Sequence, residues 1–149
     1  MRVLVSSGAG FLLAVLWFDL MFDTQVLGQR GKALREDTLD SISRYYSRVT
    51  TTAKPMNRVV GLVMLVTLGA LIIQVQQNQI LTSRAIISLI LLISAIALAL
   101  GHTLRNAIRL GRQDADLVTQ SRLARLVFRD HVICFVAIGT LLMLQLLPV

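Results

Sequence analysis

The chain has 149 residues, which is the usual size of one domain, and it carries a net charge of +7. Apolar residues make up 55 % of the chain and charged residues 15 %, whereas soluble domains average about 45–50 % and about 25 %. This composition excludes an ordinary soluble domain and indicates a protein whose solvent is largely lipid.

The apolar residues are concentrated in four runs that can cross a membrane as helices. A spanning helix needs roughly 20 mostly apolar residues, and its backbone polar groups are satisfied inside the helix itself. The predicted spans cover residues 3–22, 59–75, 85–102 and 132–147. The sequence therefore predicts an all-α integral membrane four-helix bundle, in which residues 1–149 form a single transmembrane domain.

Small and amide side chains indicate where the predicted helices meet. Ser6, Gly10 and Ala14 are spaced four residues apart on the first span, so they share a face on which a neighbouring helix can approach closely. Gln74 and Gln145 belong to the second and fourth spans, at the end away from the long connections. We expect them to hydrogen-bond between helices.

The first long connection, between spans one and two, contains an amphipathic pattern. Leu39, Ile42, Tyr46 and Val49 recur every three or four residues, which is the period of a helix. We predict that this helix lies on the lipid surface, with Tyr45 and Tyr46 at the level of the headgroups.

The second long connection, between spans three and four, is predicted to be mostly helical. The third helix should continue past His102 to Leu110 and end at Gly111, and another helix should begin near Asp114. The connection between spans two and three, by contrast, is a short polar turn around residues 76–79.

The distribution of basic residues predicts the orientation of the chain. Thirteen of the fifteen Lys and Arg residues fall in the two long connections, and basic segments stay on the cytoplasmic side during insertion. Both long loops should therefore be cytoplasmic and both termini non-cytoplasmic. The outline is similar to that of several groups of small bacterial four-helix membrane proteins, a likeness of architecture that implies a bacterial inner membrane.

Asp19 is the first candidate site residue, because it lies about one turn inside the end of the first span. A carboxylate is costly in lipid, and the short Asp side chain cannot reach back to water as Lys and Arg can. Asp19 should therefore have a partner. Either it forms an ion pair with Arg58 or Arg105 that holds the helices in register, or it binds a cation or shares a proton with Asp23.

Two histidines are expected at the same level of the bundle as Asp19. His102 ends the third span and His131 precedes the fourth. Asp19, His102 and His131 are thus the candidate catalytic residues, since a carboxylate and an imidazole can act as acid and base. No metal site is predicted, because the spacing of metal-binding pairs is missing; Asp23 and Asp130 are the weak candidates. The sequence names no cofactor.

The arginines of the second long connection form two stripes, each on one helix face. Such stripes contact anionic headgroups, or they form a docking face for an acidic or phosphate-bearing partner. Nucleic-acid binding is not expected, because no aromatic residues alternate with the arginines. The candidate binding residues are Asp19, Asp23, Arg58, Arg105, Arg122, Arg125 and Arg129.

The sequence favours an accessory or scaffolding membrane subunit that binds a membrane protein partner, or a homo-oligomer in contact with lipid. Its support is the small-residue faces, the basic helical connections and the absence of a catalytic motif. Two alternatives remain open. One is a membrane enzyme that acts on a lipid or hydrophobic small molecule at an Asp/His site near the cytoplasmic interface, and the other is an oligomeric ion- or proton-coupled carrier.

Overall fold

A computed structural model of the protein describes residues 1–77 and 83–147, and within these ranges the chain is helical, with no strand. The elements in chain order are α1 (Arg2–Asp23), η1 (Thr24–Val26), α2 (Glu36–Thr51), α3 (Lys54–Gln77), α4 (Ser83–Leu98), η2 (Ala99–Thr103), α5 (Leu104–Arg112) and α6 (Leu117–Leu146). The first η element is a 3₁₀ turn and the second is a π-helical turn that joins α4 to α5. Part of the polar turn predicted around residues 76–79 lies outside the described residues.

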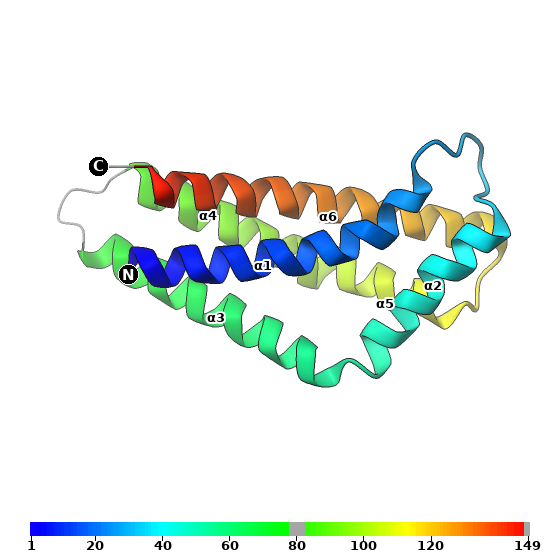
Figure 1. Cartoon of the computed structure of the whole chain (residues 1–149), viewed down its shortest axis with the longest axis horizontal. Coiled ribbons are helices and arrows are strands. Elements are labelled where there is room, and N and C mark those ends of the chain that lie inside the picture. Colours follow the sequence, from blue (N-terminus) through cyan, green and yellow to red (C-terminus); the bar gives the residue numbers. More distant parts are fainter. Residues whose placement is uncertain (78–82, 148–149) are drawn as a thin grey trace.

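Four helical segments are long and apolar enough to cross a membrane, which confirms the predicted all-α membrane bundle. They are Arg2–Val26, Lys54–Gln77, Ser83–Arg112 and Leu117–Leu146. In Figure 1 these segments run along the long axis of the molecule, and the start of α1 lies beside the end of α6. We call this the terminal end. The opposite end, which contains α2 and α5, is the loop end.

The described chain has two apolar cores, one along the spans and one at the loop end. The membrane core joins α1, α3, α4 and α6 through Val5, Ala9, Leu12, Ala70, Leu71, Leu92, Ala95, Cys134, Ile138 and Leu141. The loop-end core joins α2, α5, α6 and the segment after α1 through Val26, Leu34, Leu39, Ile42, Tyr46, Ala107, Leu110, Leu123, Ala124 and Val127.

The loop-end core shows that the helix of the first connection does not lie on the lipid surface, so this part of the prediction was wrong. The predicted helix exists as α2, but Ile42 and Tyr46 are 0 % and 2 % exposed. Its apolar face therefore packs on α5 and α6 rather than on lipid. An amphipathic sequence can bury its apolar face in either environment, so the pattern by itself could not distinguish them.

At two glycines a neighbouring helix lies so close that an added Cβ would collide with it. A Cβ at Gly8 would collide with the Thr67 hydroxyl of α3, whereas a Cβ at Gly10 would meet no atom within 4 Å. The helix contact predicted from the small-residue stripe is thus made by a glycine outside that stripe. A Cβ at Gly111 would lie 2.8 Å from the backbone nitrogen of Ser47 in α2. Gly111 therefore allows α5 and α2 to touch.

The predicted end of the third helix at Gly111 was wrong. The helix continues to Arg112 and stops at Gln113, which takes a left-handed conformation with φ 56°. α6 then begins at Leu117, where the Asp116 side chain accepts a hydrogen bond from the backbone nitrogen of Thr119 at 3.2 Å. This is an N-cap.

The terminal end is held by a chain of amide hydrogen bonds, as predicted. Gln74 donates to Gln145 at 3.2 Å, and Gln145 donates to the hydroxyl of Ser88 at 3.1 Å. These bonds connect α3, α6 and α4 where the membrane core ends.

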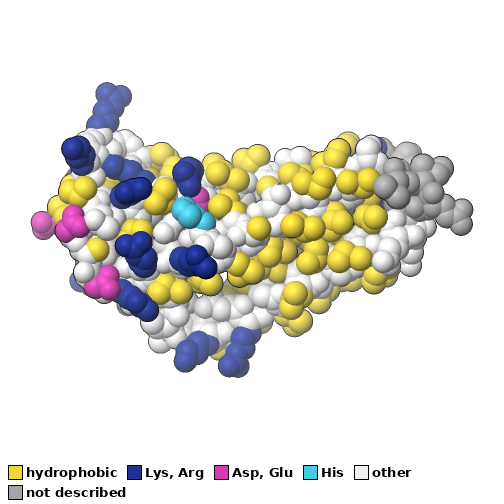
Figure 2. All heavy atoms as spheres, turned by 180° about the vertical axis from the view of Figure 1, so that it is seen from behind, with side chains coloured by type: hydrophobic (Ala, Val, Ile, Leu, Met, Phe, Trp, Pro, Cys, Tyr) yellow, Lys and Arg dark blue, Asp and Glu magenta, His cyan; other side chains and the backbone are white. Residues whose placement is uncertain are grey.

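Charge is segregated along the molecule. Figure 2 shows basic side chains gathered over the loop end and apolar side chains covering the spans. α6 has 30 residues and is about 45 Å long, while the hydrocarbon layer is about 30 Å thick. The loop end of α6 therefore extends beyond the hydrocarbon.

Candidate functional site

A layer of polar side chains separates the two apolar cores. On α6, Asp130 and His131 stand between Val127 of the loop-end core and Cys134 of the membrane core. His131 is about 22 Å from the Leu146 end of the helix, which places the layer near the loop-end boundary of the hydrocarbon. Both residues are buried, so α6 needs polar partners from neighbouring helices at this level.

His131 lies in one of two polar clusters. The His131 cluster is formed by Asp19 and Asp23 of α1, Tyr45 and Tyr46 of α2, and His131. The Tyr45 hydroxyl donates to Asp19 Oδ1 at 2.6 Å, and the Tyr46 hydroxyl donates to Asp23 Oδ1 at 2.7 Å. His131 Nδ1 lies 2.6 Å from Asp23 Oδ2. Because an ionised carboxylate can only accept, we assign the proton to this nitrogen.

The tyrosines act as donors in this cluster. Burial and the Asp23 carboxylate raise the pKa of Tyr46 well above its ordinary value, and burial and the Asp19 carboxylate do the same for the pKa of Tyr45. Both phenols therefore keep their protons. Their rings also hold α2 in place, since Tyr45 stacks on Phe22 of α1 with ring centroids 4.0 Å apart.

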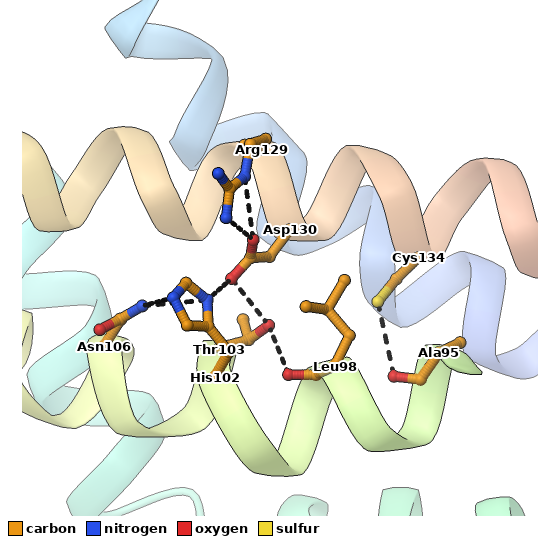
Figure 3. Close-up of polar contacts among 8 residues, drawn as sticks. All are labelled: Ala95, Leu98, His102, Thr103, Asn106, Arg129, Asp130 and Cys134. Atoms are coloured by element: carbon orange, nitrogen blue, oxygen red, sulfur yellow. Dashed lines mark hydrogen bonds and ion pairs between the residues drawn. The ribbon is translucent and has the colours of Figure 1, made fainter. Parts of the chain in front are cut away.

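Asp130 lies at the centre of the second cluster, which also contains His102, Thr103, Asn106 and Arg129 (Figure 3). Asp130 Oδ2 is bonded to His102 Nδ1 and accepts from the Thr103 hydroxyl at 3.3 Å, while Oδ1 accepts from Arg129 Nη2 at 3.0 Å. The Asn106 amide lies 3.2 Å from the His102 ring nitrogens. Every oxygen of this fully buried carboxylate thus has a partner.

An apolar cavity of about 340 Å³ adjoins the His131 cluster. Residues from α1, α2, α3, α4, η2, α5 and α6 line it, most of them aliphatic. Asp19, Tyr46 and His131 form a polar part of its wall, and Thr103 adds a hydroxyl. The arrangement combines an apolar space with a few convergent polar groups, which is the usual composition of a ligand site.

The structure brings some predicted site residues together and separates others. Asp19, Asp23 and His131 share one cluster, while His102 belongs to the other. The predicted ion pair of Asp19 with Arg58 or Arg105 was wrong: in the part of the chain that the structure describes, the carboxylate contacts Tyr45 and lies near His131.

The predicted binding arginines lie at the loop end in three kinds of environment. Arg58, Arg105 and Arg122 are exposed. Arg129 is bonded to Asp130, and Arg125 donates to the backbone carbonyls of Gln29 at 3.3 Å and Lys32 at 3.4 Å. Arg125 therefore anchors the segment between η1 and α2.

Tyr45 and Tyr46 were missed as site residues because they were interpreted as membrane-interface anchors. Tyr46 follows Leu39 and Ile42 on the apolar face of α2, and a hydroxyl on a buried face needs a hydrogen-bond partner. That position could have identified it as a partner for a buried carboxylate.

The weak metal candidates Asp23 and Asp130 lie in different clusters. Within residues 1–77 and 83–147, no group of three or more His, Cys, Asp or Glu side chains is arranged to hold a metal ion. The cluster geometry is instead that of hydrogen-bonded acid–imidazole and acid–phenol pairs.

Comparison with protein families matches nearly the whole chain to a family model. Residues 1–147 match the SHR3 chaperone family model, which is described as "ER membrane protein SH3". Comparison with curated proteins and with solved structures gives no significant match.

Proposed function

Because the chain belongs to the SHR3 chaperone family of ER membrane proteins, we propose that it is a chaperone of the ER membrane that binds a partner membrane protein through its transmembrane helices. The family match over residues 1–147 carries this proposal, since it includes all four membrane helices and both long connections. We therefore propose the ER membrane in place of the bacterial inner membrane expected from the helix outline.

The surface of the spans supports a partner that is itself embedded in lipid. Large apolar side chains are exposed on several helices, among them Leu65 of α3 at 68 %, Ile90 of α4 at 57 % and Val136 of α6 at 61 %. A helix of another membrane protein can pack on such faces in place of lipid. Close packing and interhelical hydrogen bonds then favour association.

We further propose that the loop end faces the cytosol and both termini face the ER lumen. The concentration of basic residues at the loop end supports this orientation. In sealed ER microsomes, a membrane-impermeant thiol reagent should label Arg35→Cys without detergent and Ser83→Cys only after permeabilisation. Both side chains are exposed, while the native Cys134 is buried. The reverse pattern would contradict the orientation.

The proposed function is tested by extracting the protein intact from ER membranes in mild detergent and weighing the complexes by native mass spectrometry. A reproducible stoichiometric membrane protein partner is expected. A homo-oligomer carrying only lipid or a small molecule would contradict the proposal.

Arg122 and Arg125 provide a second test at the loop end. If the arginine stripe that contains Arg122 and Arg125 docks the partner, Arg122→Glu should weaken co-purification of that partner. The variant should stay folded, because Arg122 is exposed. Arg125→Glu should also release the segment anchored at Gln29 and Lys32. Unchanged co-purification of Arg122→Glu would show that this face is not the docking surface.

One observation favours the alternative of a membrane enzyme. Asp19 and His131 face the same apolar cavity, as an acid–base pair acting on a hydrophobic substrate would. Under this alternative, His131→Gln should abolish turnover of a lipid or hydrophobic small molecule without changing partner binding. Under the chaperone proposal, partner binding changes instead.

A further inference from the structure

The cavity beside the His131 cluster opens to the surface of the spans. Leu100 of η2 and Leu104 of α5 both line it, yet they are 57 % and 45 % exposed. On the α3 side the lining includes Asn57, which is exposed, and Gly61, where an added Cβ would meet no atom within 4 Å. In Figure 1 the loop-end half of α3 diverges from the other spans. Access to the cavity is therefore lateral, past apolar side chains.

Two polar atoms at the cavity wall lack a hydrogen bond. Asp19 Oδ2 and His131 Nε2 are 3.9 Å apart, which is too far for a hydrogen bond, and among the described residues neither atom has another partner. The other atoms of the same groups are occupied, since Tyr45 donates to Asp19 Oδ1 and Asp23 accepts from His131 Nδ1. The wall thus holds a carboxylate oxygen and an imidazole nitrogen in fixed positions, ready for a third group.

The charge of the wall favours a cationic or hydrogen-bond-donating group. Asp19 and Asp23 flank a single imidazole, so with both carboxylates ionised one negative charge remains even when His131 is protonated. No Lys or Arg of the described chain lines the cavity. A carboxylate in such surroundings binds an ammonium or guanidinium strongly.

The size of the cavity limits the occupant to a side chain or a small group. A helix with its side chains is about 10–12 Å across, so a space of 340 Å³ cannot take one whole. One long side chain can enter while its helix lies along the exposed apolar residues at the mouth. Basic side chains inside transmembrane helices are costly in lipid until they find a partner.

We propose that this cavity receives a basic side chain from a transmembrane helix of the partner protein, with Asp19 as its counter-charge. The inference rests on the proposed chaperone function and gives its chemistry: the protein shields a polar residue of a membrane helix that has not yet reached its final partner. Gly61 keeps the entrance open, and the tyrosines of α2 hold the two carboxylates in place.

The experiment uses the full chain reconstituted in phosphatidylcholine liposomes with synthetic transmembrane peptides of Leu and Ala. One peptide carries a lysine near one end of its apolar stretch, at the depth of Asp19 and His131, and its matched control carries norleucine there; both carry a photoreactive leucine one turn away. The lysine peptide should cross-link about tenfold more than the control, the ratio that a charge-assisted hydrogen bond supplies. Equal cross-linking of the two peptides to the unaltered protein overturns the proposal.

Variants identify the cavity as the site. In Asp19→Asn the ratio of lysine-peptide to norleucine-peptide cross-linking should fall to about one. The amide can still accept a hydrogen bond from Tyr45, but it carries no charge. Gly61→Leu should reduce cross-linking of the lysine peptide by filling the entrance. Gly69→Leu is the matched control, since Gly69 lies on the same helix, is also open within 4 Å and does not line the cavity. A ratio that survives in Asp19→Asn counts against the proposal.

The outcomes separate this inference from the proposed function. If a membrane protein co-purifies but the lysine peptide is not preferred, the inference fails and the chaperone function stands. A lipid that co-purifies with Gly69→Leu but not with Gly61→Leu, without preference for the lysine peptide, would assign the cavity to lipid instead. If no partner co-purifies, the proposed function fails whatever the peptides do.

Discussion

Asp130 and His131 are neighbours on α6, yet they belong to clusters that use their polar atoms differently. Both oxygens of Asp130 are bonded, to His102 and Thr103 on one side and to Arg129 on the other. The His131 cluster leaves Asp19 Oδ2 and His131 Nε2 without a hydrogen bond beside a cavity. The Asp130 cluster is therefore filled and contributes to stability, whereas the His131 cluster is open and has capacity left for a ligand. The comparison predicts that substitutions in the two clusters affect different measurements.

The largest effect is expected at the filled cluster. Asp130→Ala should lower the free energy of unfolding by about 3 kcal/mol, because charge-assisted bonds each contribute about 1.5–3 kcal/mol and the half-exposed Arg129 and His102 can still reach water. Unfolding in mixed micelles, followed by circular dichroism, measures it. Asp19→Asn is the control from the open cluster and should lose less. Equal losses for the two variants would remove the distinction between the clusters.

The next effect is expected where α5 touches α2. In Gly111→Ala the new Cβ meets the backbone of Tyr46 and Ser47 at 2.8–3.0 Å, and backbone atoms cannot rotate away. The variant should displace α2, together with Tyr46, and lower the free energy of unfolding by about 1–3 kcal/mol.

The same unfolding measurement applies to Gly111→Ala, with Gly69→Ala as the control because a Cβ there meets no atom within 4 Å. The Asp130 cluster contains no residue of α2. Partner binding should therefore decrease more in Gly111→Ala than in Asp130→Ala, if the open cluster is the binding site. The opposite order would assign binding to the filled cluster.

A smaller effect is expected from the phenol donors of the open cluster. Tyr46→Phe removes a bond to a buried carboxylate and should cost about 1.5–2 kcal/mol in the same unfolding assay. Tyr45→Phe should cost less, because its hydroxyl and Asp19 are only partly buried. If both substitutions cost nothing, the tyrosines do not hold the carboxylates.

The smallest effect is expected at the start of α6, the helix that carries both clusters. Hydrogen bonds from Thr119 hold the pKa of Asp116 below its ordinary value of 3.8. Its contribution to stability is therefore present above pH 3.8 and is lost as the pH falls through the lower pKa of the folded state. Asp116→Ala should be slightly less stable than the unaltered protein at neutral pH, and it should not show this loss of stability at low pH. Unfolding measured as a function of pH checks both expectations.

The fold was predictable because four long apolar runs have few alternatives to spanning a membrane. The site was predictable in part. Asp19, Asp23 and His131 are costly in lipid wherever they occur, and their positions at the ends of spans placed them at one level. Their partners were not predictable, because the side on which α2 buries its apolar face depends on how the first connection folds back. The folding back of the first connection brings Tyr46 to Asp23. The helical spacing of apolar residues in α2 does not specify where this connection folds.

The close contact of α5 with α2 was not predictable for a similar reason. Gly111 was interpreted as the end of a helix, since glycine often follows the last helical residue. It instead lies in the last turn of α5, one residue before the helix ends at Arg112, and its missing side chain admits the backbone of Ser47. One residue type serves both purposes, and only the neighbouring helix distinguishes them.

The π-helical turn Ala99–Thr103 has a consequence for how the chain tolerates changes in length. A single π turn takes up one residue more than an α-helical turn while the helix continues on either side. Losing one residue here would leave Ala95 facing the membrane core and Ala107 facing the loop-end core, since the wide turn would simply become regular. The same loss within α5 would rotate the following residues by about 100°. This turn is thus a place where the third membrane helix can lose a residue without uncoupling the two halves of the molecule.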